Sequence, residues 1–230
     1  MANSLHTYVM SMFKIPARFC NDLRALVSQF WWGHEERKRG IYWVPWRKLT
    51  QPKAMGGMGF RDFALFNLAL LGKQAWRLVT NPESLWAHIL RTKYYPNGDF
   101  MTTGLGCNPS YAWQGIFKAR SVLVGGLRRK IGDGLSTRVW TDAWIPHTQS
   151  GRVLSPCSPG RENMLVAELL MESGGGWKSD ELAALFLPFE QSRIANIRAS
   201  PNSSHDEWYW QLKKDGSYTV KSARACWGVV

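Results

Sequence analysis

Basic and aromatic side chains lie close together in one stretch of this chain, a combination that can bind a nucleic acid. Lysine and arginine contact phosphates, which gives affinity without sequence information, and tryptophan rings can stack on bases. Four of the thirteen tryptophans fall between residues 30 and 46, on both sides of a basic cluster. We expect phosphate contacts from Arg37, Lys38, Arg39, Arg47, Lys48, Lys53, Arg128, Arg129 and Lys130, and base stacking from Trp43 and Trp46.

The positive charge is unevenly distributed. Residues 1–148 carry 20 Lys and Arg against 8 Asp and Glu, whereas residues 149–230 carry 9 of each, so the first part holds the whole net charge of +12. Such a concentration suits a polyanion, because phosphate contacts release counterions. A solvated basic surface without a ligand is the alternative, and burial in the core is the expected role of most tryptophans.

Three glycines, Gly56, Gly57 and Gly59, resemble a phosphate-binding loop at first sight. Such a loop requires a Gly-Lys-Ser/Thr sequence after it or the spacing of a dinucleotide-binding turn, and this chain has neither. The glycines therefore predict a tight turn that leads into a helix.

The sequence shows no arrangement typical of catalysis. Glu35-Glu36 and Asp206-Glu207 are pairs of adjacent carboxylates, and we expect both pairs at the surface. No nucleophile stands at a suitable distance from a base. The five histidines are isolated: His6, His34, His88, His147 and His205. We therefore predict no independent enzyme activity and no cofactor.

The four cysteines, Cys20, Cys107, Cys157 and Cys226, lack the spacing of a metal site. Their wide separation favours reduced, mostly buried thiols in an intracellular protein, either nuclear or cytoplasmic. No apolar run reaches the ~18 residues of a membrane helix, and the N-terminus does not read as a secretory signal. The sequence thus predicts no membrane partner.

Helical periodicity dominates the chain, so we predict an α+β fold, mostly α-helical with a few short β-hairpins. Asp62 should cap the most apolar helix, residues 63–79. Other helices are expected at residues 1–13, 23–30, 85–94, 113–123, 166–171, 179–186, 188–197 and from 222 onward. A strand is expected at 41–46, and hairpins are expected at 127–140 and 206–221, around glycine-containing turns.

Proline and glycine residues that interrupt the periodic segments suggest two domains. We expect a helical domain over residues 1–148, a linker over 149–160 and a smaller α+β unit over 161–230.

Three blocks of this sequence resemble a known family. They are FWWGHEERKRGIYWVPWRKLTQPKAMGGMGFRDFALFNLALLGKQAWRLVTNPESLWAHILRTKYYPN, NPSYAWQGIFKARSVLVGGLRRKIGDGLSTRVWTDAWIP and WYWQLKKDGSYTVKSARA. Together they look like the part of plant LINE-type (non-LTR) retrotransposon polyproteins that follows the reverse transcriptase polymerase and leads into its zinc-binding region. The resemblance covers nearly the whole chain and preserves the order of the blocks.

The resemblance implies a thumb- or connector-like helical domain followed by the truncated start of the reverse transcriptase zinc-binding region. Such polymerases need paired aspartates that hold two metal ions, and this sequence has no Asp-Asp pair. The family's ribonuclease H domain and the zinc ligands would lie beyond Val230.

The resemblance therefore implies a non-catalytic fragment that binds the backbone of RNA or DNA. A remnant or domesticated structural or protein-interaction module is the alternative, in which a protein partner covers apolar faces near both ends of the chain.

Overall fold

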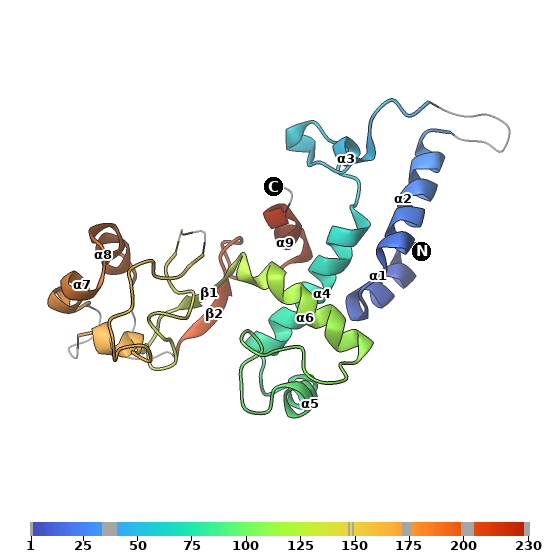
Figure 1. Cartoon of the computed structure of the whole chain (residues 1–230). Coiled ribbons are helices and arrows are strands. Elements are labelled where there is room, and N and C mark those ends of the chain that lie inside the picture. Colours follow the sequence, from blue (N-terminus) through green and yellow to red (C-terminus); the bar gives the residue numbers. More distant parts are fainter. Residues whose placement is uncertain are drawn as a thin grey trace. The chain divides into compact units, whose positions relative to one another are not determined.

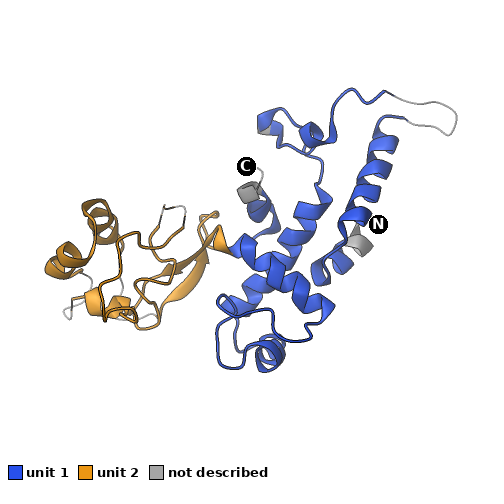
Figure 2. Cartoon of the chain, viewed as in Figure 1, with its two compact units in different colours: residues 1–123, 219–230 blue, residues 124–218 orange. Residues whose placement is uncertain are grey.

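The computed structural model describes residues 2–33, 41–146, 148, 150–171, 176–198 and 205–227, without the side chains of residues 2–6, 54 and 225–227. The chain forms two compact units (Figure 2). Unit 1 comprises residues 1–123 and 219–230, and unit 2 comprises residues 124–218.

Unit 1 is built from helices (Figure 1). They are α1 (Ala2–Met12), α2 (Ala17–Trp31), α3 (Trp46–Leu49), the 3₁₀ helix η1 (Lys53–Met55), α4 (Phe63–Thr80), α5 (Leu85–Tyr94), α6 (Tyr111–Val124) and α9 (Val220–Trp227). The apolar helix α4 lies at the centre and packs against α1, α2, α5 and α9. Its first turn is capped as expected, because Asp62 Oδ1 accepts a hydrogen bond from Leu65 N at 3.0 Å.

Asn67 joins α4 to the turn between α1 and α2. Its side chain is only 2% exposed. The amide nitrogen donates to Met10 O at 2.6 Å and to Phe13 O at 2.8 Å, while the amide oxygen accepts from Ile15 N at 2.8 Å. One buried side chain thus provides hydrogen-bonding partners for three backbone groups, which would otherwise lose water without compensation.

Trp113 of α6 is the centre of a second cluster in unit 1. Its ring stacks on Tyr94 at a centroid distance of 4.5 Å and meets Phe100 edge to face at 5.8 Å. Its indole nitrogen donates to Leu105 O at 3.0 Å. This fully buried tryptophan therefore has the core role that we expected of most tryptophans.

Unit 2 contains a two-stranded antiparallel sheet, β1 (Leu127–Lys130) with β2 (Glu207–Trp210), in which Leu127 lies opposite Trp210. It also contains the 3₁₀ helix η2 (Val166–Leu169), α7 (Ser179–Leu185) and α8 (Pro188–Ala195). Its core gathers buried apolar side chains from residues 131–194, among them Trp144 and Trp177, whose rings stack at 5.8 Å.

Asp206, expected at the surface, is instead buried beneath the loop that follows β1. Its carboxylate accepts hydrogen bonds from Gly132 N, Gly134 N and Ser136 N at 2.8–3.2 Å, and from the hydroxyls of Thr137 at 2.7 Å and Ser136 at 3.2 Å. Burial raises the pKa of Asp206, but the hydrogen bonds from Thr137 and the three amides outweigh burial and leave the pKa below its ordinary value.

A second buried carboxylate, that of Glu190, binds the backbone of the segment around residue 155. Glu190 of α8 is 2% exposed and accepts hydrogen bonds from Leu154 N at 2.7 Å and Ser155 N at 3.0 Å, as well as from the Ser155 hydroxyl. Residues 149–160, expected as a linker, therefore include backbone that is fixed to the core of unit 2.

The mostly helical fold class is confirmed, but the strands pair differently from our expectation. Residues 127–130 and 207–210 are strands, yet they pair with each other and not with the segments that follow them. In the 135–140 segment only Arg138 forms an isolated bridge, to Leu165, and residues 217–219 form no strand before α9 begins. Residues 41–45 are an irregular segment and not a strand.

The division into units also differs from the expected boundary at residue 148. Unit 2 begins at residue 124, and the chain returns to unit 1 at residue 219. The physical reason is that Ile131 and Trp144 share their core with Val166 and Leu169, across the expected linker. Within the described residues, none of the helices is long and apolar enough to cross a bilayer.

Asn67→Ala should destabilise unit 1, because the substitution leaves two carbonyls and one amide without partners. An unsatisfied buried polar group costs about 1–3 kcal/mol. The free energy of unfolding in urea measures the effect, and Asn21→Ala, at an exposed position of α2, is the matched control. Equal stability of the two variants would contradict the assigned role.

The lowered pKa of Asp206 predicts a loss of stability in acid. A carboxyl whose pKa is depressed in the folded state stabilises the fold above its unfolded pKa, about 3.9, and this contribution disappears as pH falls through the folded pKa. Asp206→Asn should lower the stability near neutral pH and flatten its decline below about pH 4. Denaturant titrations from pH 2 to pH 7 test this, with Asp180→Asn, at an exposed site, as the control.

Candidate nucleic-acid interface

The glycine-rich segment after α3 forms a closed turn. Leu49 O accepts hydrogen bonds from Met58 N at 3.2 Å and Phe60 N at 3.0 Å, and Gly59 N donates to Gln51 O at 3.0 Å. A Cβ at Gly57 would lie 2.1 Å from Gln51 O, so this position requires glycine. Because the amides of the turn bind the chain itself, they cannot cradle a phosphate, and the expected tight turn is confirmed.

Trp46 and Trp43 have different environments. Trp46 is half-buried, and the centre of its ring lies 5.6 Å from that of Phe60 and 6.5 Å from that of Phe63. The ring centres of Trp31 and Phe60 are 5.0 Å apart. Trp46 thus belongs to an aromatic cluster that joins α2, α3 and α4. Trp43 is 74% exposed and has the accessible ring that base stacking requires.

Arg47, Lys48 and Lys53 lie at the surface beside Trp43 in sequence. Arg47 and Lys48 come from the single turn of α3, and Lys53 comes from η1. Among the described residues, none of these three cations forms an ion pair with a carboxylate. We call the four residues Trp43, Arg47, Lys48 and Lys53 the α3 surface. The predicted contacts Arg37, Lys38 and Arg39 lie outside the described residues.

Arg128 does not belong to a surface cluster, although the sequence suggested it. Its side chain is 0% exposed, and its guanidinium donates to Leu127 O at 2.8 Å and Thr148 O at 3.0 Å. Gly151, at a φ of 73°, passes so close that an added Cβ would lie 2.3 Å from Arg128 Nε. The arginine therefore supports unit 2 from within and presents no charge to a phosphate.

The neighbours of Arg128 divide between the interior and the surface. Arg129 is half-buried; its guanidinium lies 4.2 Å from the centre of the Trp208 ring and donates to Ser136 O at 3.0 Å. Lys130 is exposed. Of this predicted basic triplet only Lys130 presents its charge fully to solvent.

The two units differ sharply in charge. Unit 1 has 18 Lys and Arg against 6 Asp and Glu, whereas unit 2 has 11 of each, so unit 1 carries the entire net charge of +12. The ion pairs Arg161–Glu181 and Lys213–Asp215 and the hydrogen bond between His205 and Asp133 all belong to unit 2. The cations of unit 1 thus have few acidic neighbours to neutralise them.

The part of the chain that the structure describes contains no group of three or more His, Cys, Asp or Glu side chains able to hold a metal ion. Cys20 is buried, but Cys107 and Cys157 are exposed, so the expectation of mostly buried thiols is wrong for these two. Glu35-Glu36 lies outside the described residues.

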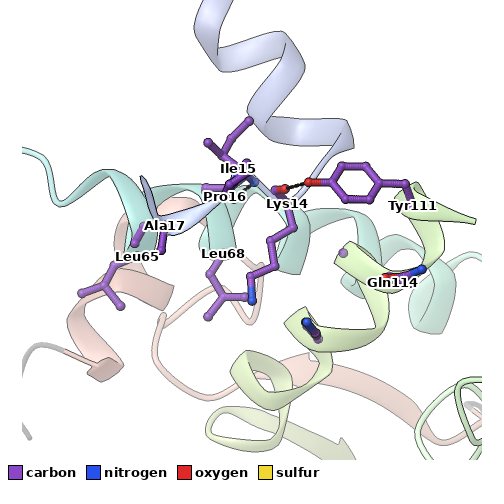
Figure 3. A pocket seen from close by; sticks show the side chains of 12 residues that line it. Lys14, Ile15, Pro16, Ala17, Leu65, Leu68, Tyr111 and Gln114 are labelled. Carbon is purple, nitrogen blue, oxygen red and sulfur yellow. Dashed lines mark hydrogen bonds between the residues drawn. The ribbon is translucent and has the colours of Figure 1, made fainter. Parts of the chain in front are cut away.

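Sequence reasoning missed a groove in unit 1, whose volume is about 500 Å³ (Figure 3). It lies between the turn after α1, the first half of α4 and the start of α6, and Lys14 and Lys118 are its charged lining residues. These lysines are far apart in the sequence, and no local pattern links them. Only the tertiary packing of α6 beside the turn brings them to one site.

Comparison with known proteins finds two similar proteins of Arabidopsis thaliana. It is 44% identical over 143 residues to the "Uncharacterized mitochondrial protein AtMg00310" of Arabidopsis thaliana, an alignment that covers 62% of this chain and 93% of that protein. The chain belongs to the family of that protein. The alignment thus includes most of the Arabidopsis protein.

A second relative is longer. The chain is 29% identical over 240 residues to the "Putative ribonuclease H protein At1g65750" of Arabidopsis thaliana. The alignment covers 96% of this chain but 36% of that protein. The chain thus spans about a third of the length of this relative. No family model and no solved structure matches the chain.

Substitution of Trp46 should lower the stability of the fold, whereas substitution of Trp43 should not. Trp46→Ala removes the ring that Phe60 and Phe63 contact and should lower the free energy of unfolding by on the order of 2 kcal/mol. Trp43→Ala, at an exposed position, should leave it nearly unchanged. Thermal and urea denaturation compare the two, and equal losses would show that Trp43 is part of the packed structure.

Proposed function

We propose that this chain is a non-catalytic segment of a plant LINE-type retrotransposon polyprotein and binds the backbone of RNA or DNA through unit 1. The α3 surface makes the phosphate contacts with Arg47, Lys48 and Lys53, and Trp43 stacks on a base. Arg37, Lys38 and Arg39, just before it in sequence, add charge to the same segment. Lys130 of unit 2 is a further phosphate contact, while Arg128 is excluded from this role.

The observation that carries this proposal is the confinement of the whole net charge of +12 to unit 1, where the exposed cations lack carboxylate partners among the described residues. Lysine and arginine side chains that have no carboxylate partner can neutralise phosphates, and each such contact releases counterions that are condensed on the nucleic acid. Unit 2 balances its charges internally and would contribute little to this attraction.

The relatives support the proposed origin. The name of the longer relative refers to ribonuclease H, an activity on nucleic acid, and this chain aligns with 36% of it. The three blocks that resemble the segment after a LINE-type polymerase lie between residues 30 and 225 of the 230 and contain 125 residues. We place the protein inside the cell, in the nucleus or cytoplasm; the name of the first relative adds the mitochondrion as a compartment to examine.

A protein-interaction module is the second candidate, and exposed apolar side chains on α2 favour it. Leu26, Phe30 and Trp31 are all exposed, and Phe30 is 87% exposed. Exposed apolar groups of this size attract a partner or cause association. Under this alternative the purified chain should self-associate and should not bind nucleic acid, whereas a cooperatively folded monomer that binds RNA would contradict it.

Binding to fluorescein-labelled single-stranded RNA and DNA 20-mers should weaken steeply with salt. For single strands the slope of log K against log [salt] is about −0.7 for each phosphate that the protein neutralises. The triple variant R47A/K48A/K53A should therefore reduce the slope by about 2. Fluorescence anisotropy at several KCl concentrations measures both quantities.

The matched control is K73A/R77A/K93A, which removes the same charges from exposed positions of α4 and α5. It should retain most of the binding, because these residues lie outside the α3 surface. A flat salt response of the parent protein would refute nucleic-acid binding. Equal losses in the two triple variants would refute the α3 surface as its location.

A further inference from the structure

The groove in unit 1 has the chemistry of a binding site that is separate from the α3 surface. Its apolar lining comes from Ile15, Pro16 and Ala17 on one side and from Leu65 and Leu68 of α4 on the other (Figure 3). Pro16 and Ala17 are exposed, so the groove opens to solvent along the surface and is not an enclosed cavity. Its volume of about 500 Å³ lies within the range of ligand sites in proteins.

The wall of the groove is fixed in position. The buried Asn67 side chain binds the backbone at Met10, Phe13 and Ile15, as described above. From the other side, the Tyr111 hydroxyl donates to Lys14 O at 2.5 Å, a contact drawn in Figure 3. A site that is held in shape before binding loses less conformational entropy when a ligand enters.

Glycine at one position allows the groove to form. A Cβ at Gly115 of α6 would lie 3.1 Å from Lys14 N and 3.4 Å from Leu71 Cδ1. The absence of a side chain lets α6 approach the turn after α1 and bring Lys118 into the same lining as Lys14.

The charges of the groove have one sign. Lys14 and Lys118 are both exposed, and the residues that line the groove include no Asp or Glu. Among the described residues, neither lysine forms an ion pair. The groove therefore combines an aliphatic floor with two ammonium groups, and its complement is an apolar side chain flanked by carboxylates.

We propose that this groove binds an acidic peptide segment of a partner protein. One apolar side chain of the segment, aliphatic or aromatic, enters between the α1–α2 turn and α4, and carboxylates beside it pair with Lys14 and Lys118. The inference does not depend on nucleic-acid binding, because none of its residues belongs to the α3 surface.

A peptide fits these observations better than a nucleotide. A base needs an accessible aromatic face, and the groove has a single aromatic residue, Tyr111, whose ring stacks on Phe13 at 5.9 Å and whose hydroxyl binds Lys14 O. A small molecule is usually buried over most of its surface in its pocket, which this open groove does not provide. An apolar side chain of a bound peptide needs only an apolar surface beneath it and lysines beside it, and the groove provides both.

The test uses the full chain and a fluorescein-labelled dodecapeptide in which two glutamates stand on each side of a central Leu-Phe pair. A second peptide has glutamine in place of glutamate, and a third has serine in place of Leu-Phe. We expect the first peptide to bind and the other two to bind at least about tenfold more weakly, a difference of about 1.4 kcal/mol. Fluorescence anisotropy measures the affinities.

Two variants locate the binding. K14E/K118E reverses the groove charges, and A64W fills the groove from an exposed position of α4. Each should weaken the first peptide by at least about tenfold. The matched controls K73E/K93E and A25W change exposed residues outside the lining and should retain binding, and circular dichroism melting checks that every variant folds.

Several results would overturn the proposal. They are equal binding of the glutamate and glutamine peptides, equal losses in the groove and control variants, or unchanged affinity in A64W. Displacement of the peptide by an oligo(dT) 12-mer, together with weaker oligonucleotide binding by K14E/K118E, would assign the groove to nucleic acid instead. If R47A/K48A/K53A bound RNA and DNA as tightly as the parent protein, only the nucleic-acid proposal would be refuted. The peptide proposal would be unaffected, so the two proposals can be tested separately.

Discussion

Buried polar side chains that capture loop backbone are the interactions on which both units depend. Asp206 binds three amides of the loop after β1, Glu190 binds two amides at residues 154–155, and Asn67 binds the turn between α1 and α2. Much of this chain is irregular, so its backbone groups cannot all pair within helices or strands. A few well-placed side chains provide the partners that secondary structure does not.

The same requirement explains why Arg128 is absent from the surface and why Arg129 is half-buried. Arg128 donates to backbone carbonyls within unit 2, and Arg129 packs against Trp208 and donates to Ser136 O. A guanidinium that holds carbonyls in the interior costs too much to withdraw for a ligand. Charge that supports the fold is thereby separated from charge that is exposed to solvent, such as that of Lys130.

The sequence predicted most of the helices because their signals are local, but it missed the short helices α3 and η1. Asp62 stands directly before the apolar run of α4 and caps it, and the glycines after α3 form the expected turn. The sheet could not be predicted in the same way, because β1 pairs with a strand far away in the sequence. Likewise, nothing near Arg128 or Asp206 in the sequence signals burial; Gly151 and the loop at residues 132–137 create those environments only after folding.

The division of charge between the units suggests why one chain would contain both. Unit 2 has equal numbers of acidic and basic residues, and its observed ion pairs are internal, so it can fold with little electrostatic self-repulsion. Unit 1 keeps an excess of 12 positive charges on a helical body and must tolerate their repulsion. Folding alone does not require that excess, and a polyanion or an acidic partner would relieve it. If the α3 surface and the groove bind the ligands that we propose, each ligand would also stabilise the folded protein.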